Sequence, residues 1–383
     1  MDARMLLDAC SAAGIDFVTG VPDSQLKGLC DTLYACYGTG SGKHIVAANE
    51  GNAVALAAGH YLATGKPALV YMQNSGLGNA VNPLASLMDE KVYGLPALLV
   101  IGWRGEPGVK DEPQHVKQGA VTLEQLTLLD VPYFIIGKDT GETEFKDMFV
   151  RAMDCLAQGK CAAFVVRKGG LTCGVKPGYA HEAPMTREAA LAAVVAQGRR
   201  GDIFVSTTGK LSRELFELRE KLGQGHGMDF LTVGCMGHAS SIALGIALAR
   251  PDRRVWCLDG DGAALMHLGA MQIAAQQQPA NLIHVVMNNG AHESVGGMPV
   301  CDQQLSLGAL ALTMGYGRVK SADTVEETAA FAGELRAEEG LSFLEIRCAL
   351  GAREDLGRPT TTPVENRDAF MAYVMDGEER TGK

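Results

Sequence analysis

The chain has 383 residues, enough for two domains of ordinary size that each bury a core of their own. Its 34 lysines and arginines stand against 44 aspartates and glutamates, a formal net charge of −10, and neither sign forms a long run. These values argue against nucleic acid or an anionic membrane as the main partner, although local basic pockets can still bind small acidic metabolites.

The sequence predicts neither a targeting segment nor a membrane span. The first residues lack the apolar core of a signal peptide, and the most apolar stretches, such as residues 96–103, are too short to cross a bilayer. We therefore expect a cytoplasmic protein. The ten cysteines include no Cys-x-x-Cys pair and no zinc-like spacing, so they are predicted to be reduced and mostly buried, without a structural metal site.

The first predicted strand leads into a turn that carries polar side chains. Residues 17–21 form this strand, the turn reads Gly20-Val21-Pro22-Asp23-Ser24, and a helix is predicted over residues 25–34. Asp23 or Ser24 is placed to cap that helix, and capping is the favoured local interpretation of Asp23.

Glu50 lies where a second strand, beginning at His44, changes into an alanine-rich helix that reaches Ala63. A carboxylate at the start of a helix interacts favourably with the helix dipole. In an apolar, glycine-rich setting it can also be a buried acid with a raised pKa. The local sequence leaves these two interpretations equally open.

Two further strands, residues 67–72 and 97–102, are each followed by a polar segment. The first ends in the glycine-rich run from Gln73 to Asn79. The second leads into residues 103–115, which are too polar for a core and too long for a tight turn. Such a segment is either mobile surface or a functional lid. Its candidate contacts to an anionic substrate are Arg104, Lys110 and His115.

The order of the elements predicts the fold class. Strands near residues 133–136 and 162–166 complete the first half, and strands alternate with helices throughout. This order is typical of a parallel sheet with helices on both faces. The second half repeats it without a sequence repeat, so we expect an α/β protein with two doubly wound parallel-sheet domains.

A linker is predicted between the two halves. The segment 176–185 loses the periodicity and contains Pro177, Gly178 and Pro184. The predicted domains are therefore residues 1–175 and 186–383.

Two apolar strands of the second half end in oxygen-bearing side chains and glycines. One ends in Asp259-Gly260-Asp261-Gly262 and the other in Asn288-Asn289-Gly290, with 25 residues, 263–287, between them. Because ligands collect beyond the carboxyl ends of neighbouring parallel strands, Asp261 and Asn289 can project into one crevice. Mg²⁺ prefers such oxygen ligands and usually retains a phosphate among them. The glycines would let the backbone approach a diphosphate, toward which a helix predicted from about Ala264 would turn its N–H groups.

Gly-Asp-Gly alone is a weak pattern, since it also fits an Asp-Gly turn after a buried strand. With two asparagines at this spacing, the chain resembles the thiamine-diphosphate-dependent 2-oxo acid decarboxylases. Gly20 to Ser24, Asn49-Glu50-Gly51-Asn52 and Gly234-Cys235-Met236-Gly237 support the resemblance. Within that family the chain is most similar to the phosphonopyruvate decarboxylases and next to the sulfopyruvate decarboxylases, over nearly its whole length. The segments that carry this narrower resemblance are residues 21–24, 111–115 and 288–297.

The resemblance implies a thiamine-diphosphate-binding fold, with a pyrimidine-binding first domain, a diphosphate-binding second domain and no middle domain. It also implies a homodimer or higher homo-oligomer with the cofactor at the subunit interface. By motif position, Asp261, Asn289 and the carbonyl of Ala291 would bind Mg²⁺. The predicted cofactor contacts are Asn74, Thr208, Gly209, Gly234, Met236, Gly260, Gly262 and Ala263. Of these, the carbonyl of Gly234 would accept from the pyrimidine amino group, and Met236 would support the bent cofactor.

The implied reaction is non-oxidative decarboxylation of 3-phosphonopyruvate, a small anionic 2-oxo acid, to phosphonoacetaldehyde and CO2. Glu50 would hydrogen-bond the pyrimidine ring and promote proton removal from the thiazolium carbon. Release of the aldehyde needs a proton donor near the former carbonyl carbon, for which Asp23 and His115 are the candidates. The anionic tail needs cationic or N–H donors. The candidates for that contact are Arg104, Lys110 and His292.

One departure keeps the substrate open. The phosphonopyruvate decarboxylase pattern continues Gly-Gly-Gln-Pro-Thr after the asparagines, whereas this chain has Met298 and Val300 at the two polar positions. Sulfopyruvate, or another short 2-oxo acid that is decarboxylated or used to form a C–C bond, is therefore the alternative substrate.

Two other classes of protein are disfavoured. A non-enzymatic cofactor-binding protein is expected to lack Glu50 or the metal ligands, and all of them are present. A nicotinamide-dependent oxidoreductase needs Gly-x-Gly-x-x-Gly after the first strand, where this chain reads Gly20-Val21-Pro22-Asp23.

Overall fold

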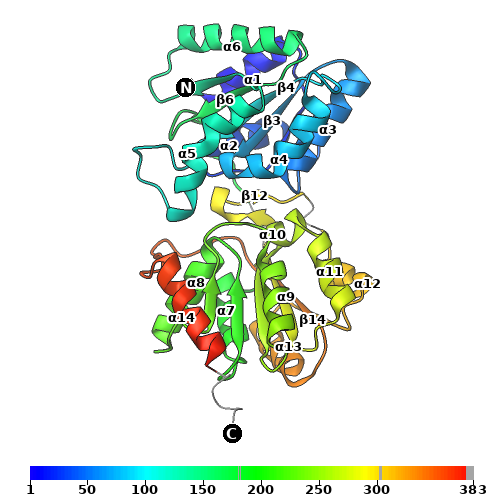
Figure 1. Cartoon of the computed structure of the whole chain (residues 1–383), viewed down its shortest axis with the longest axis vertical. Helices are drawn as coiled ribbons and strands as arrows, with labels where there is room; N and C mark the ends of the chain where they lie inside the picture. The colour runs from blue at the N-terminus through cyan, green and yellow to red at the C-terminus, as the bar shows by residue number, and fades with distance from the viewer. Residues whose placement is uncertain (180, 182, 302–303, 377–383) are drawn as a thin grey trace. The chain divides into compact units, whose positions relative to one another are not determined.

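The computed structural model describes residues 1–179, 181, 183–301 and 304–376 (Figure 1). The chain forms two compact units. The first comprises Met1–Tyr179 and Ser294–Cys301, and the second Ala180–Glu293 and Asp302–Lys383. Two residues of the predicted linker, 180 and 182, lie outside the described residues, so the linker and the predicted domain boundaries stay predictions.

The first unit contains a sheet of six parallel strands in the order β2-β1-β3-β4-β6-β5. The strands of this sheet are β1 (Val18–Gly20), β2 (His44–Val46), β3 (Ala68–Gln73), β4 (Ala97–Gly102), β5 (Tyr133–Ile136) and β6 (Ala162–Val166). The helices are α1 (Ala3–Ala12), α2 (Lys27–Tyr37), α3 (Glu50–Thr64), η1 (Asn74–Gly76), α4 (Leu77–Pro83), η2 (Leu84–Met88), α5 (Pro113–Leu128) and α6 (Glu142–Ala157). The unit also includes β12 (Met298–Pro299).

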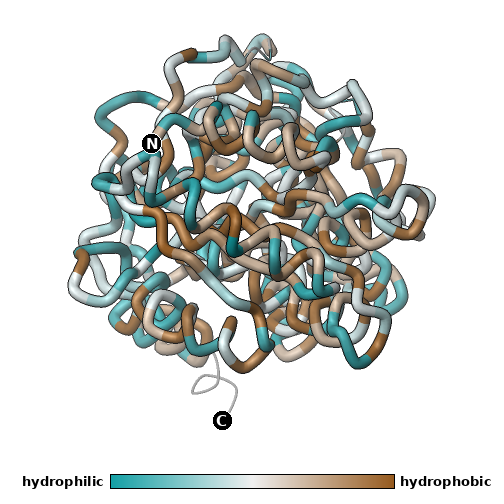
Figure 2. The backbone as a smooth tube through the Cα atoms, turned by 90° about the horizontal axis from the view of Figure 1, so that it is seen from above, coloured by the Kyte–Doolittle hydropathy of each residue, from teal (hydrophilic) through white to brown (hydrophobic). Residues whose placement is uncertain are grey.

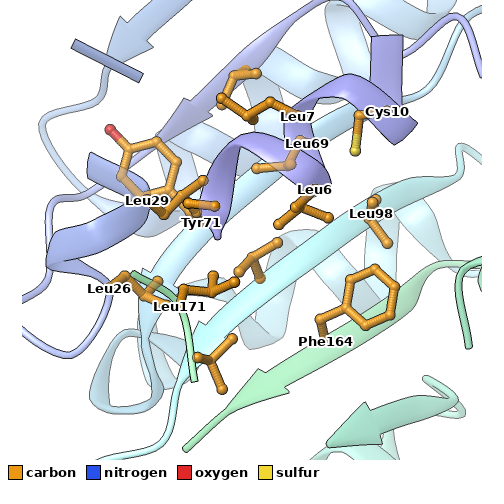
Figure 3. Packing of buried hydrophobic residues seen from close by; sticks show 14 of the residues in the cluster. Leu6, Leu7, Cys10, Leu26, Leu29, Leu69, Tyr71, Leu98, Phe164 and Leu171 are labelled. Atoms are coloured by element: carbon orange, nitrogen blue, oxygen red, sulfur yellow. The ribbon is translucent and has the colours of Figure 1, made fainter. Parts of the chain in front are cut away.

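Helices cover both faces of this sheet, which explains why its strands are apolar at successive positions. Because side chains of a strand alternate between faces, Leu69 and Tyr71 of β3 pack with α1, α2 and α6, whereas Val70 and Met72 pack with α3, α4 and α5. Figure 3 shows Leu6 of α1 lying over the sheet beside Leu69 and Leu98. Each fully buried leucine of this kind contributes about 1.5–3 kcal/mol to stability.

The second unit contains another sheet of six parallel strands, in the order β13-β14-β10-β9-β7-β8. The strands of the unit are β7 (Ile203–Ser206), β8 (Asp229–Leu231), β9 (Val255–Gly260), β10 (Leu282–Asn288), β11 (Ala291–His292), β13 (Arg318–Ala322) and β14 (Ser342–Arg347). The helices are α7 (Arg187–Val195), α8 (Lys210–Lys221), α9 (Ala239–Ala249), α10 (Asp261–Met266), α11 (Gly269–Gln277), α12 (Leu307–Met314), α13 (Val325–Ala337) and α14 (Pro363–Met375). The short 3-10 helix η3 (Glu293–Val295) begins at the last residue of the first segment of this unit.

Two apolar clusters cover the two faces of the second sheet. Helices α7, α8 and α13 contribute to one, and α9, α11, α12 and α14 to the other. Neighbouring residues of β9 alternate between the clusters, with Trp256 and Leu258 on one side and Val255 and Cys257 on the other. Together the two sheets confirm the predicted α/β fold class.

Hydrophobic and hydrophilic residues are intermixed along the coloured part of the backbone in Figure 2. Among the described residues, no helix combines the length and the apolar character that crossing a membrane requires. All ten cysteines are free thiols, and five of them are buried.

Two local predictions were wrong, and one helix was missed. Helix α2 begins at Lys27 rather than at residue 25, so Asp23 is not its N-cap. Helix α10 begins at Asp261 rather than near Ala264, because an acidic residue is favourable in the first helical turn. The last helix, α14, was not predicted, although Thr362 and Glu365 form a capping box that the sequence displays.

Candidate active site

Glu50 is the first residue of α3 and is only 5% exposed. Asn49 caps the helix by accepting from the backbone of Asn52, which places Glu50 in the first turn with its side chain directed inward. Its Oε2 accepts a hydrogen bond from Asn79 Nδ2 at 2.8 Å. Burial raises the pKa of Glu50, and the bond from Asn79 opposes that rise. Both interpretations of this carboxylate therefore apply, since it opens a helix and is also a buried acid.

Gly76 makes room for the Glu50 carboxyl group. A Cβ atom at Gly76 would lie 2.3 Å from Oε1 of Glu50. In the polar segment after β3, Gly76 thus leaves space for the Glu50 carboxyl group, and Asn79 donates a hydrogen bond to it.

Asn74, in the same segment, is fully buried and bonded within the protein. Its Nδ2 donates to the carbonyl of Arg104 at 2.8 Å and to Thr122 Oγ1 at 2.9 Å, and its Oδ1 accepts from the Arg104 backbone. These bonds anchor the start of the loop after β4. A cofactor contact by Asn74 stays a prediction.

Asp23 is a buried carboxylate in the turn that precedes α2. Its Oδ2 accepts from the backbone N–H groups of Gln25 and Leu26, whereas its Oδ1 has no hydrogen-bond partner. Burial raises the pKa of Asp23 to about 7, against the effect of these N–H groups and of Arg104. Asp23 can therefore hold a proton near neutral pH.

The loop between β4 and α5 is closed by an ion pair. Arg104 donates from Nε and Nη2 to Asp111, at 2.8 and 2.5 Å, and from Nη1 to Ser24 Oγ at 3.0 Å. The guanidinium of Arg104 holds the pKa of Asp111 well below its usual range. Gly105 packs so closely on α5 that a Cβ atom at Gly119 would lie 1.7 Å from the Gly105 carbonyl oxygen.

The other two predicted residues of this loop region differ in exposure. Lys110 is exposed, whereas His115, in the first turn of α5, is half-buried. Burial, followed by the charge of Arg104, lowers the pKa of His115. His115 is therefore mostly neutral near pH 7 and can accept a proton.

In the second unit, Asp261 and Asn289 follow adjacent strands. Strands β9 and β10 are paired in parallel, with Gly260 opposite Met287. The segments that follow the two strands therefore leave the sheet at the same edge. Asp261 and Asn289 are each 4% exposed. Backbone N–H groups of both loops, among them those of Gly262, Gly290 and Ala291, favour the ionised form of the Asp261 carboxyl group and so lower its pKa.

Asp261 retains one carboxylate oxygen without a protein partner. Its Oδ2 is buried and accepts no hydrogen bond, and burial raises the pKa of this carboxyl group to about 7 despite the surrounding N–H groups. A buried carboxylate oxygen of this kind is costly unless a cation or a proton compensates it. The oxygen donors nearby are the hard ligands that Mg²⁺ takes, so these residues fit such an ion.

Several of the remaining predicted cofactor residues lie in backbone turns that depend on glycine. Gly209 has φ +108° and is the N-cap of α8, directly after Thr208. In the turn 234–237, Gly237 has φ +85° and Cys235 has φ +54°, a left-handed conformation that is uncommon for a residue with a side chain. Gly234 and Met236 lie in this turn and are partly exposed. Gly260, Gly262 and Ala263 surround the start of α10.

His292 is buried, and burial lowers its pKa to about 4. It is therefore neutral at pH 7 and can offer an N–H group, but no positive charge, to an anionic tail. Met298 and Val300, the two departures from the family pattern, are also buried, and Met298 belongs to an apolar cluster of the first unit.

A group of buried potential metal ligands lies elsewhere in the second unit. The ligand atoms of Cys257, Asp259 and His284 lie within 4.8 Å of one another. His284 Nε2 lies 3.4 Å from Asp259 Oδ2, and the backbone of Gly260 donates to Asp259 Oδ1. Asp259 and His284 are therefore partners of each other.

Comparisons with known proteins agree with this arrangement. Residues 3–126 match the N-terminal thiamine pyrophosphate-binding domain of thiamine pyrophosphate enzymes, and residues 207–346 match the C-terminal domain. A phosphonopyruvate decarboxylase from Streptomyces viridochromogenes is 34% identical over 97% of this chain and 94% of its own length. A phosphonopyruvate decarboxylase from Streptomyces hygroscopicus is also 34% identical, over 98% and 94%. A sulfopyruvate decarboxylase from Methanosarcina acetivorans is 27% identical over 89% of each chain.

Both cofactor-binding domains and full-length relatives are thus matched, and the catalytic class follows from them. The chain belongs to the thiamine pyrophosphate-dependent decarboxylases, in the family of the phosphonopyruvate decarboxylases.

Proposed function

We propose that this chain decarboxylates 3-phosphonopyruvate to phosphonoacetaldehyde and CO2 with thiamine diphosphate and Mg²⁺ as cofactors. The observation that carries the substrate assignment is the 34% identity to phosphonopyruvate decarboxylases over 97% of the chain, against 27% over 89% for a sulfopyruvate decarboxylase. The burial of Met298 supports tolerance of the sequence departure, because a core side chain need not contact the substrate.

In this proposal Asp261, Asn289 and the carbonyl of Ala291 hold Mg²⁺. The buried and unpartnered Oδ2 of Asp261 supports the assignment, since a hard cation would compensate it. The diphosphate would lie against Gly260, Gly262 and Ala263 and against the turn at Thr208 and Gly209, where the N-terminus of α8 provides N–H groups. Gly234 and Met236 would contact the rest of the cofactor.

Glu50 would act at the pyrimidine end. When bound, thiamine diphosphate supplies the electron sink for the loss of CO2. Because Asn79 donates to Oε2, a proton on Glu50 belongs on Oε1, the oxygen that lies against Gly76. The raised pKa keeps that proton available at higher pH than in an ordinary glutamate.

Asp23 and His115 would exchange protons with the substrate. Asp23, with a pKa of about 7 and a free Oδ1, is suited to donate the proton that releases the aldehyde. His115, with its lowered pKa, is suited to accept one. Arg104, Lys110 and the N–H group of His292 would contact the anionic tail, and Asp111 would keep the Arg104 side chain in a fixed direction.

The substrate assignment is tested by measuring aldehyde formation with thiamine diphosphate and Mg²⁺ on phosphonopyruvate, sulfopyruvate and pyruvate side by side. We expect phosphonopyruvate to give the highest kcat/KM, and chelation of Mg²⁺ to abolish turnover until the metal is restored. Higher kcat/KM on sulfopyruvate would replace the substrate assignment but leave the decarboxylase chemistry intact.

The active form in this proposal is a homodimer or a higher homo-oligomer. Each cofactor would be held by Glu50 of one copy and by the metal ligands of another. Mixing the separately inactive variants Glu50→Gln and Asp261→Asn, with exchange of subunits, is then expected to restore part of the activity, because mixed dimers contain one intact site. Activity assays after co-refolding or co-expression check this, and a mixture as inactive as its components would argue against shared sites.

A further inference from the structure

Glu293 joins several segments around Asn289. It begins η3 directly after β11, and its side chain is 13% exposed. Its Oε2 accepts from Asn289 Nδ2 at 3.0 Å and from the backbone N–H of Gly351 at 3.0 Å. Its Oε1 accepts from Lys210 Nζ at 3.0 Å. Glu293 therefore connects the loop after β10 with the start of α8 and with the chain that follows β14.

The charge of Glu293 is balanced mainly by Lys210. Arg187 Nη1 lies 3.6 Å from Oε2, but Arg187 already makes two hydrogen bonds, of 2.8 and 2.7 Å, to the buried Glu214. Lys210 is the first residue of α8 and directly follows Gly209. Through its contacts with Lys210 and Asn289, Glu293 thus links the turn assigned to the diphosphate with a residue assigned to the metal.

This contact determines which atom of the Asn289 amide faces away from Glu293. A carboxylate only accepts hydrogen bonds, so it requires the NH2 group of Asn289 on its side. The amide oxygen must then point in the other direction, where it accepts from the Ala291 backbone at 3.1 Å. An amide with no such neighbour can rotate and exchange its oxygen and nitrogen, and only the oxygen is a ligand for Mg²⁺.

We propose that Glu293 is a positioning residue that orients the Asn289 amide so that Oδ1 is presented to the metal. The inference rests on the proposed function, which assigns Asn289 as a ligand. Glutamine at this position offers both a donor and an acceptor, so it permits either orientation of the amide. Glu293→Gln is therefore expected to weaken metal affinity about 10- to 100-fold, the usual effect of losing a partner that orients a ligand.

The probe is Mn²⁺, titrated into protein saturated with thiamine diphosphate while electron paramagnetic resonance measures the free ion. We expect weaker Mn²⁺ binding by Glu293→Gln, with kcat at saturating metal close to that of the unchanged protein. The same substitution at Glu326, an exposed residue in the first turn of α13, is the control and should leave affinity unchanged.

A second background separates orientation from a general structural effect. In Asn289→Asp the ligand is a carboxylate, whose two oxygens are equivalent, so no neighbour is needed to orient it. Adding Glu293→Gln there removes a negative charge beside the cation, and this weakens Mn²⁺ binding to a similar extent in both backgrounds. The additional weakening that occurs only with asparagine at position 289 therefore measures the orientation effect. A similar weakening in both backgrounds would overturn the positioning role.

Two further outcomes are informative. If Glu293→Gln alone fails to fold, Glu293→Ala replaces it in the same comparison, and equal weakening in the Asn289 and Asn289→Asp backgrounds refutes the inference. If Asp261→Asn binds Mn²⁺ as tightly as the unchanged protein, the metal assignment itself fails, and the role of Glu293 fails with it. Loss of binding in Asp261→Asn without any change in Glu293→Gln would refute only the positioning role.

Discussion

Replacing Glu50 with glutamine is expected to lower turnover by about 100- to 10,000-fold, the usual contribution of a positioned acid or base. Glutamine has nearly the same shape, and its Oε1 can still accept from Asn79, so the surroundings of Glu50 change little. What the variant loses is the proton that the buried carboxyl group can hold and release. The loss should therefore appear in kcat, whereas cofactor binding should persist.

Steady-state kinetics on phosphonopyruvate and calorimetric titration with thiamine diphosphate measure these two effects separately. Glu142→Gln, the same change at an exposed helical position, is the control and should behave like the unchanged protein. Full turnover in Glu50→Gln would remove Glu50 from the mechanism. Lost turnover together with lost cofactor binding would instead assign it to binding.

Part of the candidate site could be predicted from the sequence, because it depends on the order of strands and helices along the chain. We could predict that Asp261 and Asn289 lie close together, since the carboxyl ends of neighbouring parallel strands lie at the same edge of a sheet. Glu50 could be singled out because a strand changes into a helix at that residue.

The partners of these residues could not be predicted, because long-range packing selects them. Asn79 reaches Glu50 from 29 positions away, and Lys210 reaches Glu293 from 83 positions away. No periodicity or spacing in the sequence marks such pairs. The ion pair of Arg104 with Asp111 is nearer in sequence, yet the sequence could not distinguish a closed loop from a mobile one.

Burial is the other property that the sequence left open, and it changes the chemistry of single residues. From the sequence, His292 was a candidate for either a cationic or an N–H donor, but burial in the folded chain lowers its pKa to about 4 and makes it neutral. Residues 294–301 follow the diphosphate motif in the sequence, yet they pack with the first unit. For Asp23, a cap in the sequence-based interpretation, burial instead predicts an unusual dependence of stability on pH.

Replacing Asp23 with asparagine is expected to stabilise the folded protein above neutral pH while it lowers turnover. The unfolded chain ionises Asp23 near pH 4, but the folded chain retains the proton until about pH 7. Between these values the folded state binds more protons, so the stability of the unchanged protein falls as pH rises and levels off above about pH 7. Asparagine carries no charge to bury, so the variant avoids this loss, which amounts to about 2–4 kcal/mol at pH 8.

Unfolding by urea at several pH values between 4.5 and 8 measures this difference. The stability advantage of Asp23→Asn should be small at pH 4.5, grow up to about pH 7 and then remain constant. Asp147→Asn, at an exposed site on α6, should show no such trend. An Asp23→Asn variant whose stability matches the unchanged protein at every pH would mean that Asp23 is ionised in the folded state.

The kinetic consequence of the same proton separates a catalytic role from a structural one. If protonated Asp23 releases the aldehyde, kcat of the unchanged protein should fall as pH rises through about 7, where the group loses its proton. Asp23→Asn should lose about 100-fold or more in kcat and should also lose this descending limb. A variant that gains stability at pH 8 but keeps full turnover would retain the buried-acid description of Asp23 and transfer the proton-donating role to another residue. A variant that loses turnover but keeps the descending limb would show that another group controls it.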